Sequence, residues 1–224
     1  MPHAVQLSLF VAALATLLSL PFAVLVAWWL ERRSGRLRGL VQILVLLPLV
    51  LPPVVTGSLL LQLFAPRGAL GGWLASIGLP VAFELTGAVV AAAVVGFPLF
   101  VLQLGQAFAS IDPRLEEQAC SLGLPPWRVF LRVSLPLAWP GLLAGATLAF
   151  ARGLGEFGAT IVLAGHVRGV TDTLPLAVHA ALQTPGGERE VLVLCAWAVA
   201  LAVLAALGFR ALLARHRKRL EWGA

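Results

Sequence analysis

Five long apolar runs dominate this chain of 224 residues and limit what it can fold into. A helix needs about 20 mostly apolar residues to cross the hydrocarbon core of a bilayer, and each run is at least that long. Hydrophobic residues make up 60% of the chain and charged residues only 12%, about half the charged share of a typical soluble domain. Because the runs lack the short alternating pattern of barrel strands, and open sheets do not cross lipid, we predict an all-α polytopic membrane protein. The predicted spans, within a single transmembrane domain over residues 1–224, are 4–30, 39–64, 85–109, 137–164 and 190–210.

Basic residues concentrate in the connections on one side of the predicted spans. The connections 31–38 and 110–136 and the tail 210–219 hold twelve of the 16 Lys and Arg residues. The other side holds Arg67, Arg168 and Arg189. Because Lys and Arg are enriched in cytoplasmic loops, we predict that the N-terminus lies outside and that the C-terminus and residues 110–136 lie in the cytoplasm. This scattered placement also argues against a nucleic-acid partner, which requires basic residues gathered on one face.

The second apolar run is interrupted by three prolines, Pro48, Pro52 and Pro53. Each removes a backbone donor and clashes with the preceding turn, so we expect a kink here. In lipid the carbonyls that lose their donors need other partners, which places the segment among neighbouring helices or along a cavity. The kink then serves either packing alone or a transport pathway, in which Thr56 and Ser58 offer weak hydrogen bonds.

The fourth run carries two opposite charges four residues apart, Arg152 and Glu156. This spacing places both on one face of a helix, and the cost of a charge at membrane depth predicts that they face the bundle interior. Pairing with each other is one solution, either within one subunit or across a dimer. The pair is either a structural tie or part of a gate, and Thr160 is a further pathway candidate. Earlier in the run, Gly141 and Gly145 form a ridge of small residues that permits close contact between helices.

A polar segment, residues 110–136, lies between the third and fourth runs and has its own helix signals. Asp112 is a favourable N-cap, Pro113 fits the first helical position, and Gly123 before the prolines 125–126 fits a C-cap. The apolar residues form two stripes at helical spacing: Leu115, Ala119 and Leu122, then Trp127, Phe130 and Val133. Taken alone, such a segment either lies on the membrane surface or docks onto a partner.

The same segment has a distinctive spacing, Glu117-x-Ala119-x3-Gly123-x9-Val133-x-Leu135-Pro136. This spacing resembles the cytoplasmic loop of permease subunits in the binding-protein-dependent, type I family of ABC importers. In that family the loop forms short coupling helices that dock into a groove on an ATPase subunit, so that closure of two ATPases moves the spans. The resemblance implies that the small Ala119 lets the helix enter the groove, that Gly123 permits a sharp turn, and that two glutamates meet basic partner residues. The implied coupling residues are Glu116, Glu117, Ala119, Leu122, Gly123, Phe130, Val133, Leu135 and Pro136.

Three further stretches resemble the permeases of molybdate, tungstate and sulfate importers, so that the resemblance covers roughly residues 5–215. The stretches are Leu46–Gly57, Phe150–Thr160 and Leu182–Glu188. The pattern Arg-x-x-Gly-Glu-Phe-Gly is shared with sulfate permeases, whereas the Ala-Thr pair after Gly158 favours molybdate. We therefore expect a permease for molybdate or tungstate. The alternatives are a sulfate or thiosulfate permease and, in another class, an ion-coupled secondary transporter, which requires intramembrane acids or inverted repeats.

The expected partners follow from what the chain lacks. It has no Gly-x4-Gly-Lys-[Ser/Thr] motif, and its one lysine is Lys218 in the tail, so it cannot form a P-loop. The resemblance implies that ATP and Mg are bound by two separate cytoplasmic ABC ATPases, and that this chain is no enzyme and binds no cofactor or metal. Five spans make a thin pathway, so we predict a symmetric homodimer within the lipid of a bacterial inner membrane. An extracytoplasmic molybdate-binding protein would dock on the outer connections 65–84 and 165–189, whose Gly and Pro content predicts compact loops.

Overall fold

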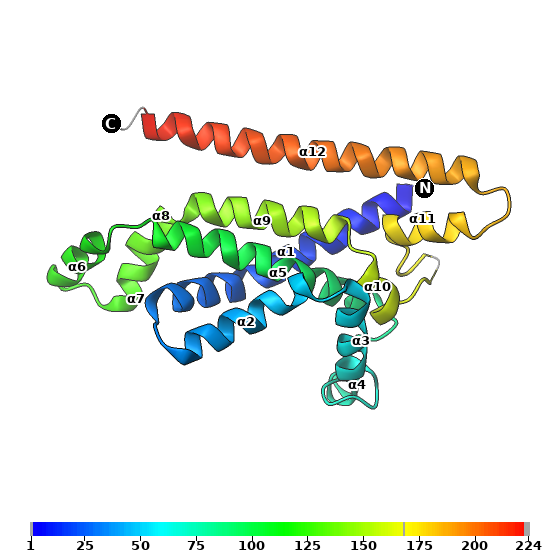
Figure 1. The fold of residues 1–224 in the computed structure, drawn as a ribbon, viewed down its shortest axis with the longest axis horizontal. Helices are drawn as coiled ribbons and strands as arrows, with labels where there is room; N and C mark the ends of the chain where they lie inside the picture. Colours follow the sequence, from blue (N-terminus) through cyan, green and yellow to red (C-terminus); the bar gives the residue numbers. More distant parts are fainter. Residues whose placement is uncertain (1, 168, 222–224) are drawn as a thin grey trace.

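The computed structural model describes residues 2–167 and 169–221, so that Arg168, counted above for orientation, lies outside the described residues. All regular structure in the described residues is helical, which confirms the all-α prediction. The helices are α1 Pro2–Arg32, α2 Arg36–Val50, α3 Pro53–Phe64, α4 Gly71–Ser76, α5 Leu85–Ala109, α6 Pro113–Ser121, α7 Pro126–Val129, a π-helix Phe130–Ser134, α8 Leu135–Leu137, α9 Trp139–Leu154, α10 Gly158–Leu163, α11 Leu174–Leu182 and α12 Glu188–Glu221. Figure 1 shows that the longest of them run along the long axis of the molecule.

Helices α1, α5 and α9 pack against one another and form the core of the bundle (Figure 1). The principal cluster of buried residues joins Ala27 of α1, Phe100 of α5 and Ala149 of α9. Because lipid is as apolar as these side chains, close packing rather than the hydrophobic effect holds such helices together. The glycine ridge of α9 serves this contact, since a Cβ added at Gly145 would lie 2.6 Å from Phe100 Cδ2.

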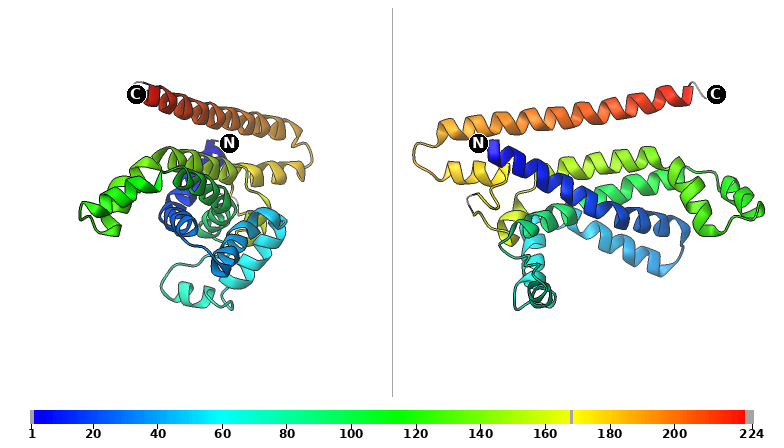
Figure 2. Two further views of the ribbon diagram at one scale, coloured as in Figure 1. Left: turned by 60° about the vertical axis from the view of Figure 1, so that its left-hand side comes forward. Right: turned by 180° about the vertical axis from the view of Figure 1, so that it is seen from behind.

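Three predicted spans correspond to continuous helices. Helix α1 covers the predicted span 4–30, and α5 has the bounds predicted for the third span, 85–109. The last predicted span, 190–210, lies within α12, which continues to Glu221. Figure 2 shows α12 running along one side of the bundle, where it packs mainly against α9 and α11.

The predicted span 39–64 is not one helix, because its prolines do more than bend it. Helix α2 ends at Val50, α3 begins at Pro53, and the two differ in direction by 115°. Pro52 and Pro53 have no N–H to continue the helical ladder, and the residue before a proline is driven out of the α region. Leu51 is accordingly extended, with ψ 143°. As a result, α3 and α4 project away from the bundle axis (Figure 1).

The predicted span 137–164 is divided as well. Helix α9 ends at Leu154 and α10 begins at Gly158, and residues 155–157 between them are not helical. At its other end, α9 is bent by 68° against the preceding helical stretch Pro126–Leu137. Three helices in the described residues are long and apolar enough to cross a membrane, and there are up to five spans if each bent pair counts as one.

The outer connections are not loops throughout, contrary to the prediction from their composition. The connection 65–84 contains α4, and the connection 165–189 contains α11. Pro175 lies in the first turn of α11. Backbone N–H groups in the first turn make no hydrogen bond within the helix, so a proline there costs the helix nothing. Pro175 therefore marks the start of a helix, whereas Pro66, Pro80 and Pro185 of the same two connections lie outside the helices.

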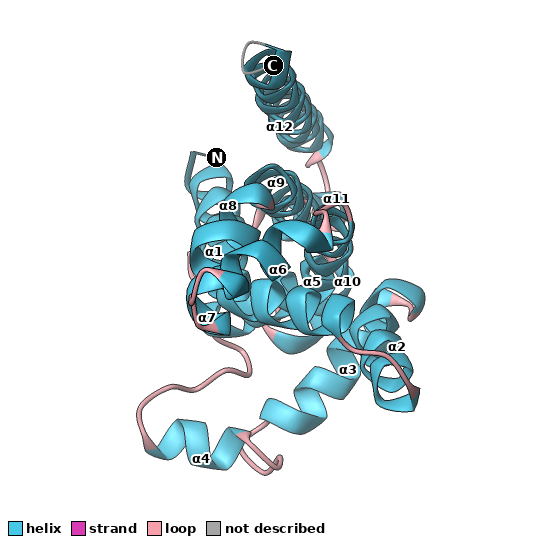
Figure 3. Cartoon of the chain, turned by 90° about the vertical axis from the view of Figure 1, so that its left-hand side faces the viewer, coloured by secondary structure: helices cyan, strands magenta, loops and turns pink. Residues whose placement is uncertain are grey.

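The bundle presents different segments at its two ends. In Figure 3, which looks along the long axis, α6, α7 and α8 lie across the end nearest the viewer. Helices α10 and α11 lie toward the opposite end, together with the start of α1 (Figure 1). The predicted coupling segment and the outer connections are thus separated by the length of the bundle.

We expect Gly145→Ala to lower the denaturation midpoint of the purified protein in detergent. Its new Cβ would lie 2.6 Å from Phe100 Cδ2 and 3.0 Å from the Phe100 carbonyl oxygen, and overpacking of this kind costs about 1–3 kcal/mol. The matched control is Gly153→Ala on the same helix, where the nearest atoms lie at an ordinary 3.5 Å. Equal stability of the two variants would contradict tight packing of α9 on α5.

Candidate functional site

The predicted coupling helix is present as α6, and its caps are those that the sequence predicts. The Asp112 carboxylate accepts a hydrogen bond from the Arg114 amide at 3.0 Å, and Pro113 occupies the first turn. At the other end Gly123 has φ +87°, a left-handed conformation that favours glycine. Leu124 N–H donates to Ala119 O and Gly123 N–H donates to Cys120 O, a pair of bonds that ends the helix as a Schellman motif.

Glu116 does not face outward as the resemblance implied. It is buried, forms an ion pair with Arg32 at the end of α1, and accepts a hydrogen bond from the Ser134 hydroxyl of the π-helix. Ala119 lies one turn further along α6 and is also buried against the rest of the chain. The expectation that Glu116 offers its charge to a partner, and that Ala119 enters a partner's groove, is therefore corrected: both residues hold α6 on its own bundle.

The residues that α6 and the following turn expose are different ones. Glu117 is exposed, and Leu122, at the C-cap, is 85% exposed, which is unusual for a leucine. Leu115 and Trp127 are exposed as well, and so is Pro136. An exposed apolar surface of this kind, next to a surface carboxylate, is suited to contact with another protein.

The return from α6 to α9 passes through a π-helix. Leu135 N–H donates to Phe130 O, five residues back, instead of to the usual carbonyl four residues back. Pro136 has no N–H for the carbonyl of Arg132, so the α-helical ladder is interrupted at this point. The wider turn packs Phe130 inward, with its ring centroid 5.1 Å from that of Trp28, and leaves Val133 half-buried and Leu135 partly buried on the core.

Val129 and Ser134 are two buried contacts of this segment that sequence reasoning missed. Val129 is 4% exposed, and the Ser134 hydroxyl donates to Glu116. Neither falls on the predicted stripe of Trp127, Phe130 and Val133, because that stripe assumes a regular helix. The proline at 136 was the signal that the regular spacing would fail.

A second set of predicted residues meets where the two interrupted helices touch. A Cβ added at Gly57 of α3 would lie 2.8 Å from Ala159 Cα of α10, and one added at Gly158 would lie 2.6 Å from Pro53 Cβ. The starts of α3 and α10 are thus in direct backbone contact. The two stretches that carry the resemblance to oxyanion permeases, Leu46–Gly57 and Phe150–Thr160, pack against each other.

Arg152 and Glu156 pair with each other within the chain, which was one of the options that the sequence left open, with Arg152 Nη1 2.7 Å from Glu156 Oε2. The geometry is that of a charge contact and not of an aligned hydrogen bond, because that oxygen has no hydrogen-bond partner among the described residues. Glu156 is 3% exposed, and its other oxygen accepts a hydrogen bond from the Ala159 amide at 2.7 Å. Glu156 therefore also accepts a hydrogen bond from an amide in the first turn of α10, which has no acceptor within its own helix. Because residues 137–164 are predicted from the sequence as one continuous span, this role could not be predicted.

The hydroxyl residues among the pathway candidates occupy different positions. Thr56 and Thr160 are buried, and Thr56 Oγ1 has no hydrogen-bond partner among the described residues. Ser58 is half-buried, and its hydroxyl donates to the Val54 carbonyl of its own helix. The junction of α3 and α10 therefore gathers Thr56, Thr160 and the ion pair, whereas Ser58 lies outside it.

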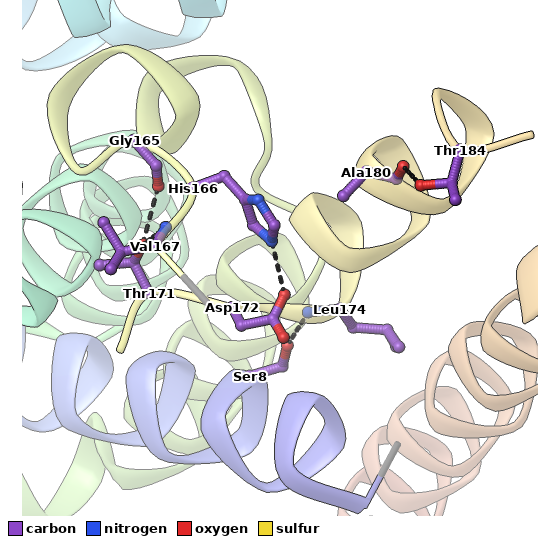
Figure 4. A network of polar contacts seen from close by, with 9 residues as sticks. All are labelled: Ser8, Gly165, His166, Val167, Thr171, Asp172, Leu174, Ala180 and Thr184. Carbon is purple, nitrogen blue, oxygen red and sulfur yellow. Dashed lines mark hydrogen bonds and ion pairs between the residues drawn. The ribbon is translucent and has the colours of Figure 1, made fainter. Parts of the chain in front are cut away.

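The loop before α11 is ordered by a network of polar contacts, drawn in Figure 4. Thr171 Oγ1 donates to the Gly165 carbonyl and accepts from the Val167 amide, and His166 Nε2 lies 2.9 Å from Asp172 Oδ1. Across the bundle, the Ser8 hydroxyl of α1 accepts a hydrogen bond from the Leu174 amide at 2.7 Å. Ser8 thus caps a helix 166 residues away, and no local sequence signal announces this contact.

Comparison with known proteins decides the family. Residues 19–219 match the family described as "Binding-protein-dependent transport system inner membrane component". The chain belongs to this family. As a member it is a transport component of the membrane, which agrees with its apolar helices.

Several relatives of the permease extend over nearly its whole length. It is 44% identical to the molybdenum transport system permease protein ModB of Haemophilus influenzae, over 98% of this chain and 96% of the relative. It is 47% identical to ModB of Escherichia coli K12, over 92% and 90%, and 39% identical to the putative molybdenum transport system permease protein YvgM of Bacillus subtilis, over 91% and 88%.

Solved structures share the fold of the permease. The MetNI methionine ABC transporter in an inward-facing conformation has a chain with TM-score 0.70 and 20% identity, covering 94% of this chain and 94% of that one. A bacterial ABC transporter involved in the import of the polysaccharide alginate has one with TM-score 0.68 and 21% identity, covering 96% and 78%. These likenesses establish the type I ABC importer permease fold.

We expect Glu116→Ala to speed amide hydrogen exchange in α6 of the permease, measured without partner proteins. Removal of the carboxylate leaves Arg32 and Ser134 without their partner, which costs about 1–3 kcal/mol and corresponds to an acceleration of roughly 5- to 150-fold. The matched control is the neighbouring Glu117→Ala, which removes an exposed carboxylate and should leave exchange in α6 unchanged. Unchanged exchange in both variants would contradict the role of Glu116 in holding α6.

Proposed function

We propose that this chain is the membrane-spanning permease subunit of an ATP-driven importer of molybdate, with tungstate as a second solute of the same charge and shape. The observation that carries the proposal is its identity of 39–47%, over at least 91% of the chain, to relatives named for molybdenum transport. The alternative solute is sulfate or thiosulfate.

The proposed assembly contains two copies of this chain, two cytoplasmic ABC ATPases and an extracytoplasmic molybdate-binding protein. ATP and Mg would be bound by the ATPases, since the chain has no P-loop motif. The basic connections support an orientation in the bacterial inner membrane with the N-terminus outside and the C-terminus and α6 in the cytoplasm. The binding protein would then meet the opposite end of the bundle, which carries α4, α11 and the polar network of Figure 4.

The contacts of α6 suggest how a docked ATPase would move the spans. The exposed surface of Leu115, Glu117, Leu122 and Trp127 is the proposed ATPase contact. Behind it, the ion pair of Glu116 with Arg32 links α6 to the end of α1. The ring of Phe130 contacts the ring of Trp28, also in α1, in a tilted arrangement. A force on α6 would therefore reach α1 through one ion pair and one aromatic contact, and would reach α9 through the chain itself.

The junction of α3 and α10 is the proposed place for the pathway. It combines two helix breaks, a buried hydroxyl at Thr56 that has no hydrogen-bond partner in the described part of the chain, and an ion pair whose glutamate is buried. Helix breaks at membrane depth are tolerated only where protein or a cavity satisfies the backbone. Few fixed positive charges suit transit of a dianion, because strong binding would slow its release.

We expect ATPase activity of the complete complex, reconstituted in lipid with its binding protein, to rise when molybdate or tungstate is added at low concentration. Sulfate at the same concentration should have no effect. Stimulation by sulfate alone would assign the chain to the sulfate and thiosulfate permeases. No response to any of the three would remove the oxyanion from the proposal and leave the family membership intact.

We expect Gly123→Val to leave the protein inserted in the membrane but to abolish transport and ATPase association. Gly123 has φ +87° with no atom within 4 Å of an added Cβ, so the effect comes from backbone strain on the turn after α6 and not from a clash. The matched control is Gly208→Val in α12, where an added Cβ also meets nothing within 4 Å. Wild-type transport by Gly123→Val would show that this turn is not part of the coupling element.

A further inference from the structure

A small pocket lies between α1, α2 and α5, at the same end of the bundle as α6. Its volume is about 200 Å³, and its polar lining consists of Glu31, Arg38, Gln42 and Gln106. Glu31 belongs to the last turn of α1, Arg38 to the first turn of α2, and Gln106 to the last turn of α5. Arg38 and Gln42 are four residues apart and therefore share one face of α2. All four side chains thus meet at one level, where the helices end.

Arg38 is the group in this pocket whose hydrogen bonding is incomplete. Its Nε is buried and has no hydrogen-bond partner among the described residues. The carboxylate of Glu31 lies 3.9 Å from Arg38 Nη2, which is too far for a hydrogen bond. Only this one nitrogen is buried, because the Arg38 side chain as a whole is 40% exposed. Its charged end is therefore accessible, and the planar guanidinium matches the oxygens of a phosphate or carboxylate.

The surroundings of the pocket are strongly positive. The connection 31–38 holds four arginines and a single acid, Glu31. Arg32 is neutralised by Glu116, whereas Arg33 and Arg36 are exposed beside the pocket. Two neutral donors, the amide groups of Gln42 and Gln106, complete the rim. An anion placed here would meet the Arg38 guanidinium and two amides, with two further positive charges nearby on the same connection. It would compete with the Glu31 carboxylate, which lines the same pocket and lies 3.9 Å from Arg38 Nη2.

The part of the pocket below this rim is apolar. Its apolar lining includes Leu30, Val45, Leu46 and Leu102. A free oxyanion gains nothing from such a surface, whereas a phospholipid places its phosphate at the helix ends and its acyl chains alongside the apolar helices. The combination of a basic rim and an apolar floor therefore favours a lipid as the source of the phosphate.

We propose that this pocket binds the phosphate of an anionic phospholipid, with Arg38 as its principal ligand and Gln42 and Gln106 as hydrogen-bond donors. Basic pockets between spans at the membrane surface have the chemistry that such headgroups require. The inference does not depend on which solute is carried or on which way the chain is oriented. Under this proposal the chain binds a specific lipid at the end of the bundle where α6 lies.

The test is native mass spectrometry of the complete complex, titrated in detergent with palmitoyl-oleoyl phosphatidylglycerol or the corresponding phosphatidylcholine. The wild type should retain phosphatidylglycerol in preference to phosphatidylcholine. Arg38→Gln should weaken that retention about tenfold or more, because it removes a hydrogen-bonded charge. An arginine that acts only as a surface charge would account for about fivefold at most. The matched control is Arg36→Gln, an exposed arginine of the same helix that does not line the pocket, and it should keep the preference. Gln106→Leu provides a second lining variant that changes no charge and should weaken retention less.

Equal retention of the two lipids by the wild type would overturn the proposal. So would equal loss in Arg38→Gln and Arg36→Gln, because it would mean that the arginines act only as a diffuse charge. A second arm measures binding of free molybdate and of inorganic phosphate to the lipid-depleted complex by equilibrium dialysis. Binding of either anion that Arg38→Gln abolishes would identify a free oxyanion, and not a lipid, as the occupant.

Discussion

A backbone amide or carbonyl at membrane depth has no water to bond, and the rest of this structure depends on how that constraint is met. The chain breaks its helices twice within apolar runs, after Val50 and after Leu154. It brings the following helices, α3 and α10, into backbone contact at Gly57 and Ala159, so that each covers the other. Glu156 completes the arrangement by accepting from the Ala159 amide. The fold can therefore keep irregular backbone in a lipid environment, which a permease needs and a simple helical bundle does not.

Polar contacts fix helix α6, the element proposed to transmit force from an ATPase to the spans. Helix α6 is short, and a helix of this length is marginal by itself. The Glu116–Arg32 ion pair, the Ser134 hydroxyl and the Schellman turn at Gly123 hold it in one orientation. The exposed surface around Leu122 is then left for a partner. Glu116 binds within its own chain, whereas Glu117 beside it remains exposed. The two residues are of the same type, so residue type alone does not distinguish them.

The sequence predicts those features whose causes are local. The caps of α6 at Asp112 and Gly123 depend on residue type alone, and the bounds of α5 follow from one uninterrupted apolar run. The four-residue spacing of Arg152 and Glu156 allows their ion pair even though α9 ends between them. What could not be predicted depends on contacts distant in sequence: which glutamate of α6 meets Arg32, how far the prolines turn α3, and the capping of α11 by Ser8. Arg38 and Gln106 likewise share a pocket only because α2 and α5 end at the same level.

The hydrogen bond from Leu174 to Ser8 has a consequence for biosynthesis. Its partners are separated by 166 positions, so α1 leaves the ribosome long before the residue that bonds to its N-terminal end. At about 5–20 residues per second, the interval is on the order of ten to thirty seconds. For most of that time α1 has neither α9 nor α11 to pack against, because both follow late in the chain. The hydrogen bond at the N-terminal end of α1 can therefore form only in the last stage of synthesis.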